Sequence, residues 1–302
     1  MIGLTIGPVV ISIFYDIGGY SLPYYVCALI SLLGIYAFYK VSQVDETLYK
    51  KEKNGKINNE NENISNKEEK KELLPLLKYP QILLLTGAIM MEGNSTGFYI
   101  ATLVNHLNET WDISTSMASL FFLSSTISYA IILQKINKLI KFFGRFPLIS
   151  LGLILSGFTC FIIAPIGFLP HSYWTILTGI IIMGINGCFI VVPSFIELTN
   201  FSKELFPDNL EMQNIIGSSF FNFSFYIADF FSPIFGSFFT SHYSFETSAY
   251  FSAVVTLCFW AVFTLFYKDK IKLFFKSKDI EENIIKEKQS NLIPMTLKSS
   301  DI

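Results

Sequence analysis

Long apolar runs, each close to the length of a membrane-crossing helix, constrain this sequence more than any other feature. A helix needs about 20 apolar residues to cross roughly 30 Å of hydrocarbon. Eight candidate runs lie at about 1–15, 20–40, 82–104, 115–134, 147–166, 174–196, 215–240 and 248–267. The first run is short for a complete span, because Asp16 interrupts it. The pattern predicts an all-α, polytopic membrane protein.

Charged residues are scarce outside two stretches. Only 15% of the 302 residues are charged, against about 25% in ordinary globular domains, and 51% are hydrophobic. Residues 41–72 and 268–302 hold 29 of the 46 charges. This distribution excludes a soluble enzyme, a disulfide scaffold and a disordered chain. The net charge of −2 gives no sign of a strongly basic surface, so we expect no nucleic-acid partner; the apolar runs make the lipid bilayer the expected partner.

Basic residues fall on only one side of the predicted membrane. All 22 lysines and arginines lie in or beside 40–78, 135–145, Lys203 and 268–302. The connections on the other side, at 16–19, 105–114, 167–173 and 241–247, hold none. Because Lys and Arg favour the cytosolic side, we expect both termini in the cytosol. A vesicular or other endomembrane and the plasma membrane stay open as locations.

The first two predicted spans are similar to the last two. When residues 6–32 are placed over 231–257, the identical pairs include Pro8/Pro233, Ser12/Ser237, Phe14/Phe239, Tyr25/Tyr250, Ala28/Ala253 and Leu32/Leu257. Parallel repeats are typical of transporters built from two six-span halves. Under this hypothesis the last six spans form a complete half, and the first two are the end of another half whose first four spans are missing. The chain alone is then expected not to transport.

This organisation predicts four regions. They are 1–40, the last two spans of an N-terminal half; 41–80, a cytosolic disordered linker; 81–267, a six-span C-terminal half; and 268–302, a cytosolic tail. The linker prediction rests on the low-complexity sequence KKEKNGKINNENENISNKEEKKE, which mixes both charge signs and cannot bury a core.

Several segments carry glycine, proline and basic motifs. Residues 3–8 (GLTIGP), followed by 15–24 (YDIGGYSLPY), resemble the fifth-span Gly-x-x-x-Gly-Pro signature of major facilitator superfamily antiporters. They are closest to the vesicular amine and polyamine, or drug:proton antiporter, branch. Residues 97–103 (GFYIATL) are similar to that branch's seventh span, although Ile100 and Ala101 replace its acidic residue and its proline. Residues 184–193 (GINGCFIVVP) resemble its tenth span, and 141–145 (KFFGR) resemble the family's Asp-Arg-x-Gly-Arg loop.

The resemblance implies a partial major facilitator fold with eight transmembrane helices, equivalent to spans 5–12 of a twelve-span transporter that is truncated at its N-terminus. It also implies transport of a small organic solute by alternating access, with proton-coupled cation antiport as one mode. The candidate gating and helix-packing residues are Gly3, Gly7, Pro8, Pro193 and Pro233. The glycines would let another helix approach closely and the prolines would bend their spans. Ordinary packing explains these residues equally well.

Polar residues inside the spans are the candidate substrate or proton site. An ionised group at this depth costs at least about 2.5 kcal/mol, so it should face the bundle or a cavity. The candidates are Glu92, Asn94, Asn186, Asn222 and Asp229. No span has a Lys or Arg in its interior to neutralise the two carboxylates. Protonated structural carboxyls remain an alternative for both acids, as does a helix-to-helix bridge for Asn186. Glu197, near the end of its span, is expected to reach water.

The sequence contains no enzyme motif, no cofactor motif and no metal-ligand spacing. Asn108, in an Asn-Glu-Thr sequence on the lysine-free side, is a candidate glycosylation acceptor. The three histidines lie on the same side and are expected to be interfacial side chains. The alternative function is a non-transporting membrane scaffold. A channel is disfavoured because the carboxylates form no ring.

Overall fold

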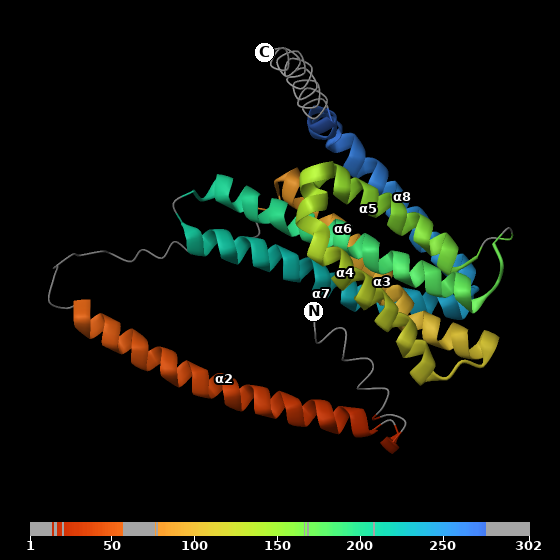
Figure 1. Cartoon of the computed structure of the whole chain (residues 1–302), viewed down its shortest axis with the longest axis horizontal. Coiled ribbons are helices and arrows are strands. Elements are labelled where there is room, and N and C mark those ends of the chain that lie inside the picture. Colours follow the sequence, from red (N-terminus) through yellow and green to blue (C-terminus); the bar gives the residue numbers. More distant parts are fainter. Residues whose placement is uncertain are drawn as a thin grey trace, which may run out of the picture. The chain divides into compact units, whose positions relative to one another are not determined.

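The computed structural model describes Phe14, 17–19, 21–56, Leu76, 78–165, Gly167, 169–207 and 209–275, with 42–56 and Glu211 described by their backbone only. All regular structure in these residues is helical (Figure 1). The helices are α2 (Ser21–Lys56), α3 (Pro80–Trp111), α4 (Thr115–Phe143), α5 (Arg145–Ile163), α6 (Tyr173–Leu205), α7 (Leu210–His242) and α8 (Phe245–Phe266). The chain divides into two compact units, Ile2–Pro75 and Leu76–Ile302, and helices α3–α8 all belong to the second.

Helix α2 is longer than the predicted second span. Its first part, Ser21–Val41, is long and apolar enough to cross a membrane. The helix then continues to Lys56, so residues 41–56, predicted as part of a disordered linker, are helical. Once the apolar turns have formed, each further residue adds one hydrogen bond, and Glu and Lys are good helix formers. The rest of the predicted linker up to Pro75 lies outside the described residues.

Five helices in the described part of the chain are long and apolar enough to span a membrane: Ser21–Val41 of α2, α4, α5, α6 and α8. Helices α3 and α7 lie where two further spans were predicted but fall short of the same hydropathy. Polar residues explain this, because α3 carries Glu-Gly-Asn-Ser-Thr at 92–96 and α7 carries Asn222, Asp229 and several serines. The predicted span 1–15, with Gly3, Gly7 and Pro8, lies outside the described residues apart from Phe14.

Helices α4 and α5 are joined by a single residue, where the sequence predicted a connection over 135–146. Gly144 has a φ of 82°, in the region that favours glycine, and its N–H donates to the carbonyl of Ile140 at 2.9 Å. The chain therefore reverses direction within one residue. As a result Lys141 and Arg145, on either side of the turn, lie at the same end of the helical bundle.

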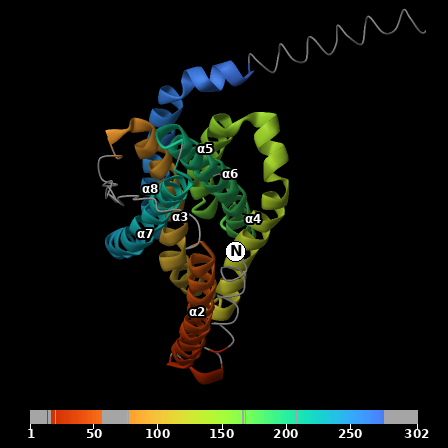
Figure 2. The same ribbon diagram turned by 90° about the vertical axis from the view of Figure 1, so that its left-hand side faces the viewer.

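Helix α6 packs along both α5 and α4, while α3 packs along α7 (Figure 2). Lipid-embedded helices gain little from the hydrophobic effect, so close contact depends on small residues. The α3–α7 contact shows this, because a Cβ at Gly93 would come within 2.7 Å of Ala228, and one at Gly97 within 3.0 Å of Ser232. Large side chains of α3, α5, α6 and α8 fill the core at one end of the bundle, among them Tyr99, Leu103, Ile163, Ile176 and Phe245.

Candidate functional site

Glu92 is a buried carboxylate on α3, and its side chain is only 5% exposed. Its Oε1 accepts a hydrogen bond of 3.3 Å from the hydroxyl of Thr96, one helical turn further along α3. Its Oε2 accepts no hydrogen bond from the residues that the structure describes. Leaving a buried polar atom without a partner costs about 1–3 kcal/mol, and more for a charged group. Glu92 is therefore the strongest candidate for a group that binds a proton or a ligand.

Gly187 brings the backbone of α6 close to the Glu92 carboxylate. A Cβ at this position would lie 2.7 Å from Glu92 Oε1 and 3.6 Å from the ring of Tyr129 on α4. Residues of α3, α4 and α6 thus meet around the carboxylate. The sequence motif at 184–187 places glycines here, and the geometry gives the reason, since any side chain at 187 would displace Glu92.

Asn186 is fully buried but points toward a different neighbour. Its amide nitrogen donates to the hydroxyl of Thr159 on α5 at 2.8 Å, while its Oδ1 accepts no hydrogen bond from described residues. Adjacent residues of a helix project about 100° apart. Asn186 therefore bridges α6 and α5, which is the alternative that the sequence left open, and no hydrogen bond joins its side chain to that of Glu92.

The other three predicted residues lie nearer the surface of the bundle. The side chain of Asn94 is half-buried, and its backbone carbonyl accepts a hydrogen bond of 2.5 Å from the hydroxyl of Ser232. Asn222 and Asp229 are exposed on α7 and lie seven residues apart, so they share one face of that helix. The structure thus brings Glu92, Thr96, Gly187 and Tyr129 together, and leaves Asn222 and Asp229 as a separate polar face.

The two predicted gating prolines that the structure describes lie inside helices. Pro193 is buried within α6, and Pro233 lies within α7 beside the close contact between Gly97 and Ser232. A proline inside a helix removes one backbone hydrogen bond and favours a bend. Their gating role stays a prediction.

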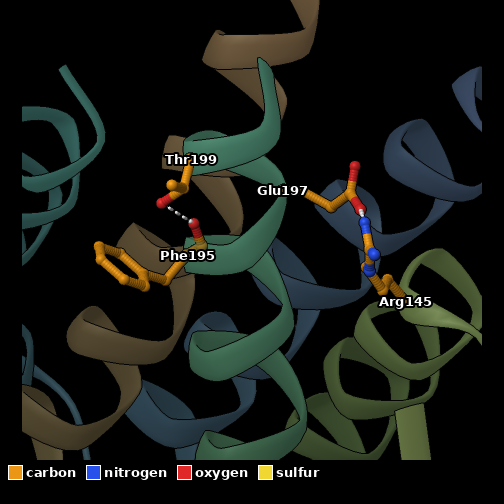
Figure 3. A network of polar contacts seen from close by, with 4 residues as sticks. All are labelled: Arg145, Phe195, Glu197 and Thr199. Atoms are coloured by element: carbon orange, nitrogen blue, oxygen red, sulfur yellow. Dashed lines mark hydrogen bonds and ion pairs between the residues drawn. The ribbon is translucent and has the colours of Figure 1, made fainter. Parts of the chain in front are cut away.

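An ion pair that the sequence did not predict joins α5 to α6. It lies at the end of the bundle where α4 and α6 carry Lys141 and Lys203 in their last turns, called the lysine-bearing end below. The guanidinium Nη1 of Arg145, the first residue of α5, donates to Oε1 of Glu197 (Figure 3). The side chain of Glu197 is 15% exposed and that of Arg145 is 41% exposed. Both residues were predicted at the lysine-bearing end, but the Glu197 carboxylate was expected to be hydrated instead of paired with Arg145. The two residues are 52 positions apart, and nothing in a single sequence indicates that side chains so far apart will meet.

We expect this ion pair to make a small but measurable contribution to stability. Partly exposed pairs are worth about 1 kcal/mol or less, so Glu197→Gln and Arg145→Gln should each lower the thermal unfolding temperature of the detergent-solubilised protein by a few degrees. The double variant should lose clearly less than the sum of the two single losses. Additive losses would show that the two side chains do not interact.

At the opposite end of the bundle, the lysine-free end, two aromatic rings contact His106. The ring of His106 stacks on Phe245 with 4.1 Å between centroids and meets Trp111 edge-on at 5.7 Å. Within the described ranges, no three His, Cys, Asp or Glu side chains lie close enough together to hold a metal ion. Asn108 is exposed near the end of α3, with its amide nitrogen donating to the carbonyl of Ile113 at 3.2 Å. Its glycosylation stays a prediction.

Comparison with known protein families identifies the family to which the chain belongs. The Major Facilitator Superfamily model matches residues 1–209. The comparison with curated proteins finds no match. The matched region includes the second predicted span, the Glu92 region of α3 and the glycines of α6. Because the match covers more than two thirds of the 302 residues, the chain belongs to the Major Facilitator Superfamily, whose members are multi-pass membrane transporters and typically not enzymes.

Proposed function

We propose that this protein, as part of a transporter with two complete halves, moves a small organic solute across its membrane by alternating access. We also propose that the Glu92 carboxyl group binds either a proton or the cationic group of the solute, while the 302 residues alone are expected not to transport. Family membership supports transport in general. One observation supports the role of Glu92: it is a buried carboxyl with an oxygen that accepts no hydrogen bond within the described part of the chain.

A buried carboxyl group can exchange a proton for a cation without changing the net charge of its surroundings. With a proton bound, Glu92 is neutral and its burial is tolerated. When an organic ammonium group approaches, the proton leaves the carboxyl group and the ammonium takes its place beside the carboxylate. Because an uncompensated charge at membrane depth is costly, the two bound forms are favoured over the empty ionised form. The proton and the cation would then move in opposite directions.

In this proposal Asn222 and Asp229 form a second polar surface that the solute contacts. Asn222 and Asp229 form a polar face on α7, and α7 packs along the helix that carries Glu92. We assign the solute to the organic amines, because residues 3–8 and 184–193 resemble motifs of the amine and polyamine antiporters. Pro193 and Pro233 would supply the bends at which the helices move. In this proposal both termini and the Arg145–Glu197 pair face the cytosol.

The proposed function can be tested without knowing the solute in advance. Membrane vesicles from cells that produce the native protein are acidified inside, and a pH-sensitive dye reports proton release when amines are added. The panel should include spermidine, a monoamine, a neutral sugar and an organic anion. We expect at least one amine to release protons faster from vesicles that contain the protein than from matched vesicles that lack it, which report the passive diffusion of the neutral amine. If no member of the panel does so while the protein is present and folded, proton-coupled amine antiport is wrong and the scaffold alternative gains support.

A further inference from the structure

The residues after α8 form a short helix that lies against the α4–α5 turn. After Tyr267 the chain turns away from the axis of α8 and continues as helix over 268–275 (Figure 2). The N–H of Ile271 donates to the carbonyl of Tyr267 at 2.9 Å, which continues the backbone hydrogen bonding past the bend. This segment, 268–275, is called the basic helix below.

Tyr267, the residue before the basic helix, and one face of the helix itself pack against the bundle. The ring of Tyr267, only 2% exposed, stacks on Phe146 of α5 at 4.3 Å. The ring of Phe274 lies 2.9 Å from the position of a Cβ at Gly144, so it covers the turn between α4 and α5. The ammonium of Lys270 lies 4.8 Å from the centroid of Phe146, within the range of a cation–π contact. These contacts hold the helix in one orientation.

The opposite face combines exposed apolar and basic side chains. Leu273 is 65% exposed and Phe275 is 46% exposed. Lys268 and Lys272 are exposed as well, and Lys270 is exposed at the edge of the face that contacts Phe146. A helix with large apolar side chains between lysines is typical of segments that lie in the interface between lipid headgroups and acyl chains. The bundle itself crosses the membrane, so this end of α8 is already close to that interface.

The charge at this end of the bundle is complementary to anionic headgroups. Lys138 and Lys141 lie on the last turns of α4, beside the turn that Phe274 covers. Asp269 is the only acidic residue of the basic helix, and Glu197 is already paired with Arg145. The lysines therefore outnumber the nearby carboxylates. Each lysine near an anionic membrane surface adds to the attraction between the protein and that surface.

We propose that the basic helix, together with Lys138 and Lys141, binds the headgroups of anionic lipids in the leaflet at the lysine-bearing end of the bundle. The ammonium groups contact the phosphates, and Leu273 and Phe275 insert beside the acyl chains. Because Phe274 and Lys270 hold the helix against the α4–α5 turn, the bound lipid lies next to Arg145. This inference does not depend on the proposed function of Glu92.

The test is to measure which lipids the full chain retains. The detergent-purified protein is mixed with equal amounts of phosphatidylglycerol and phosphatidylcholine, and retained lipids are counted by native mass spectrometry. We expect phosphatidylglycerol to be retained in excess by about tenfold, and the preference to fall steeply as the salt concentration rises. The preference should be lost in the variant Lys268→Gln/Lys270→Gln/Lys272→Gln.

Two variants separate a specific site from a general effect of charge. The variant Lys268→Arg/Lys270→Arg/Lys272→Arg, which keeps the three positive charges, should keep the preference. Lys50→Gln/Lys51→Gln/Lys53→Gln, which removes the same charge from α2, should keep it too. Equal retention of both lipids by the unmodified protein, or an unchanged preference after the glutamine substitutions in the basic helix, would overturn the proposal. Displacement of phosphatidylglycerol by soluble glycerol phosphate would indicate a site for free phosphate instead of lipid.

Discussion

Replacing Gly184 by alanine is expected to prevent the stable packing of α4 against α6. A Cβ at this position would overlap the backbone carbonyl oxygen of Ser125 and the hydroxyl of Ser128. The Ser128 hydroxyl already donates to the carbonyls of Ser125 and Ile181, at 2.8 Å each, so it links the two helices at this crossing. Because a backbone atom cannot rotate away as a side chain can, the whole of α4 must move outward.

The size of this effect follows from two opposing terms. Alanine has the better intrinsic helix propensity, which favours the variant by up to about 1 kcal/mol. Overpacking at a close contact costs about 1–3 kcal/mol and more where the backbone must shift. We therefore expect a net loss of about 2 kcal/mol or more, seen as a low yield of monodisperse protein in detergent and a fall of several degrees in the unfolding temperature.

Gly217→Ala is the matched control for this substitution. Its Cβ would lie 3.1 Å from the hydroxyl of Thr199, which is a side-chain atom on α6, and 3.6 Å from the Thr199 Cα. A small rotation of the Thr199 side chain accommodates it, so the change in stability should stay within about 1 kcal/mol. If Gly184→Ala behaves like Gly217→Ala, then α4 and α6 do not cross as closely as the structure places them.

The positions of the helices were largely predictable from the sequence, because membrane spans carry a strong and local signal. Apolar runs of about 20 residues located the five spans that meet the hydropathy expected of such helices. They also located α3 and α7, although their polar residues weaken the signal. Helix ends were less predictable. Helix α2 continues to Lys56 and α3 to Trp111, because helix propensity extends a helix beyond the bilayer while hydropathy marks only the apolar part.

The candidate site was predictable in part. Glu92 could be selected from the sequence, because a carboxylate in a span without a basic partner is rare and costly. Its neighbours could not, since hydropathy does not determine how each helix is rotated about its axis. Asn186 shows the difference, because it lies next to Gly187 in the sequence but faces Thr159 instead of Glu92. The Arg145–Glu197 pair was missed for a similar reason: each residue alone is ordinary for the end of a span.

Glu92→Gln is expected to abolish amine-driven proton release in the acidified vesicles. Glutamine has nearly the same shape as glutamate, and its carbonyl oxygen can still accept the hydrogen bond from Thr96. It can neither carry a proton at this position nor neutralise an ammonium group. The variant should nevertheless fold, with an unfolding free energy within about 1 kcal/mol of the unmodified protein, because among the described residues only the Thr96 hydroxyl is bonded to the Glu92 carboxyl group.

Two further substitutions determine how this result is interpreted. Glu109→Gln removes a carboxylate from the exposed end of the same helix and should leave proton release unchanged. Gly187→Ala keeps the Glu92 carboxyl group but forces it to move, since the new Cβ would lie 2.7 Å from Oε1, so we expect slower release that remains coupled to the amine. If Glu92→Gln retains full proton release, then Glu92 is a structural carboxyl group. Asp229, exposed on α7, would then be the carboxylate to test next, because the proton must still be carried by a group within the spans.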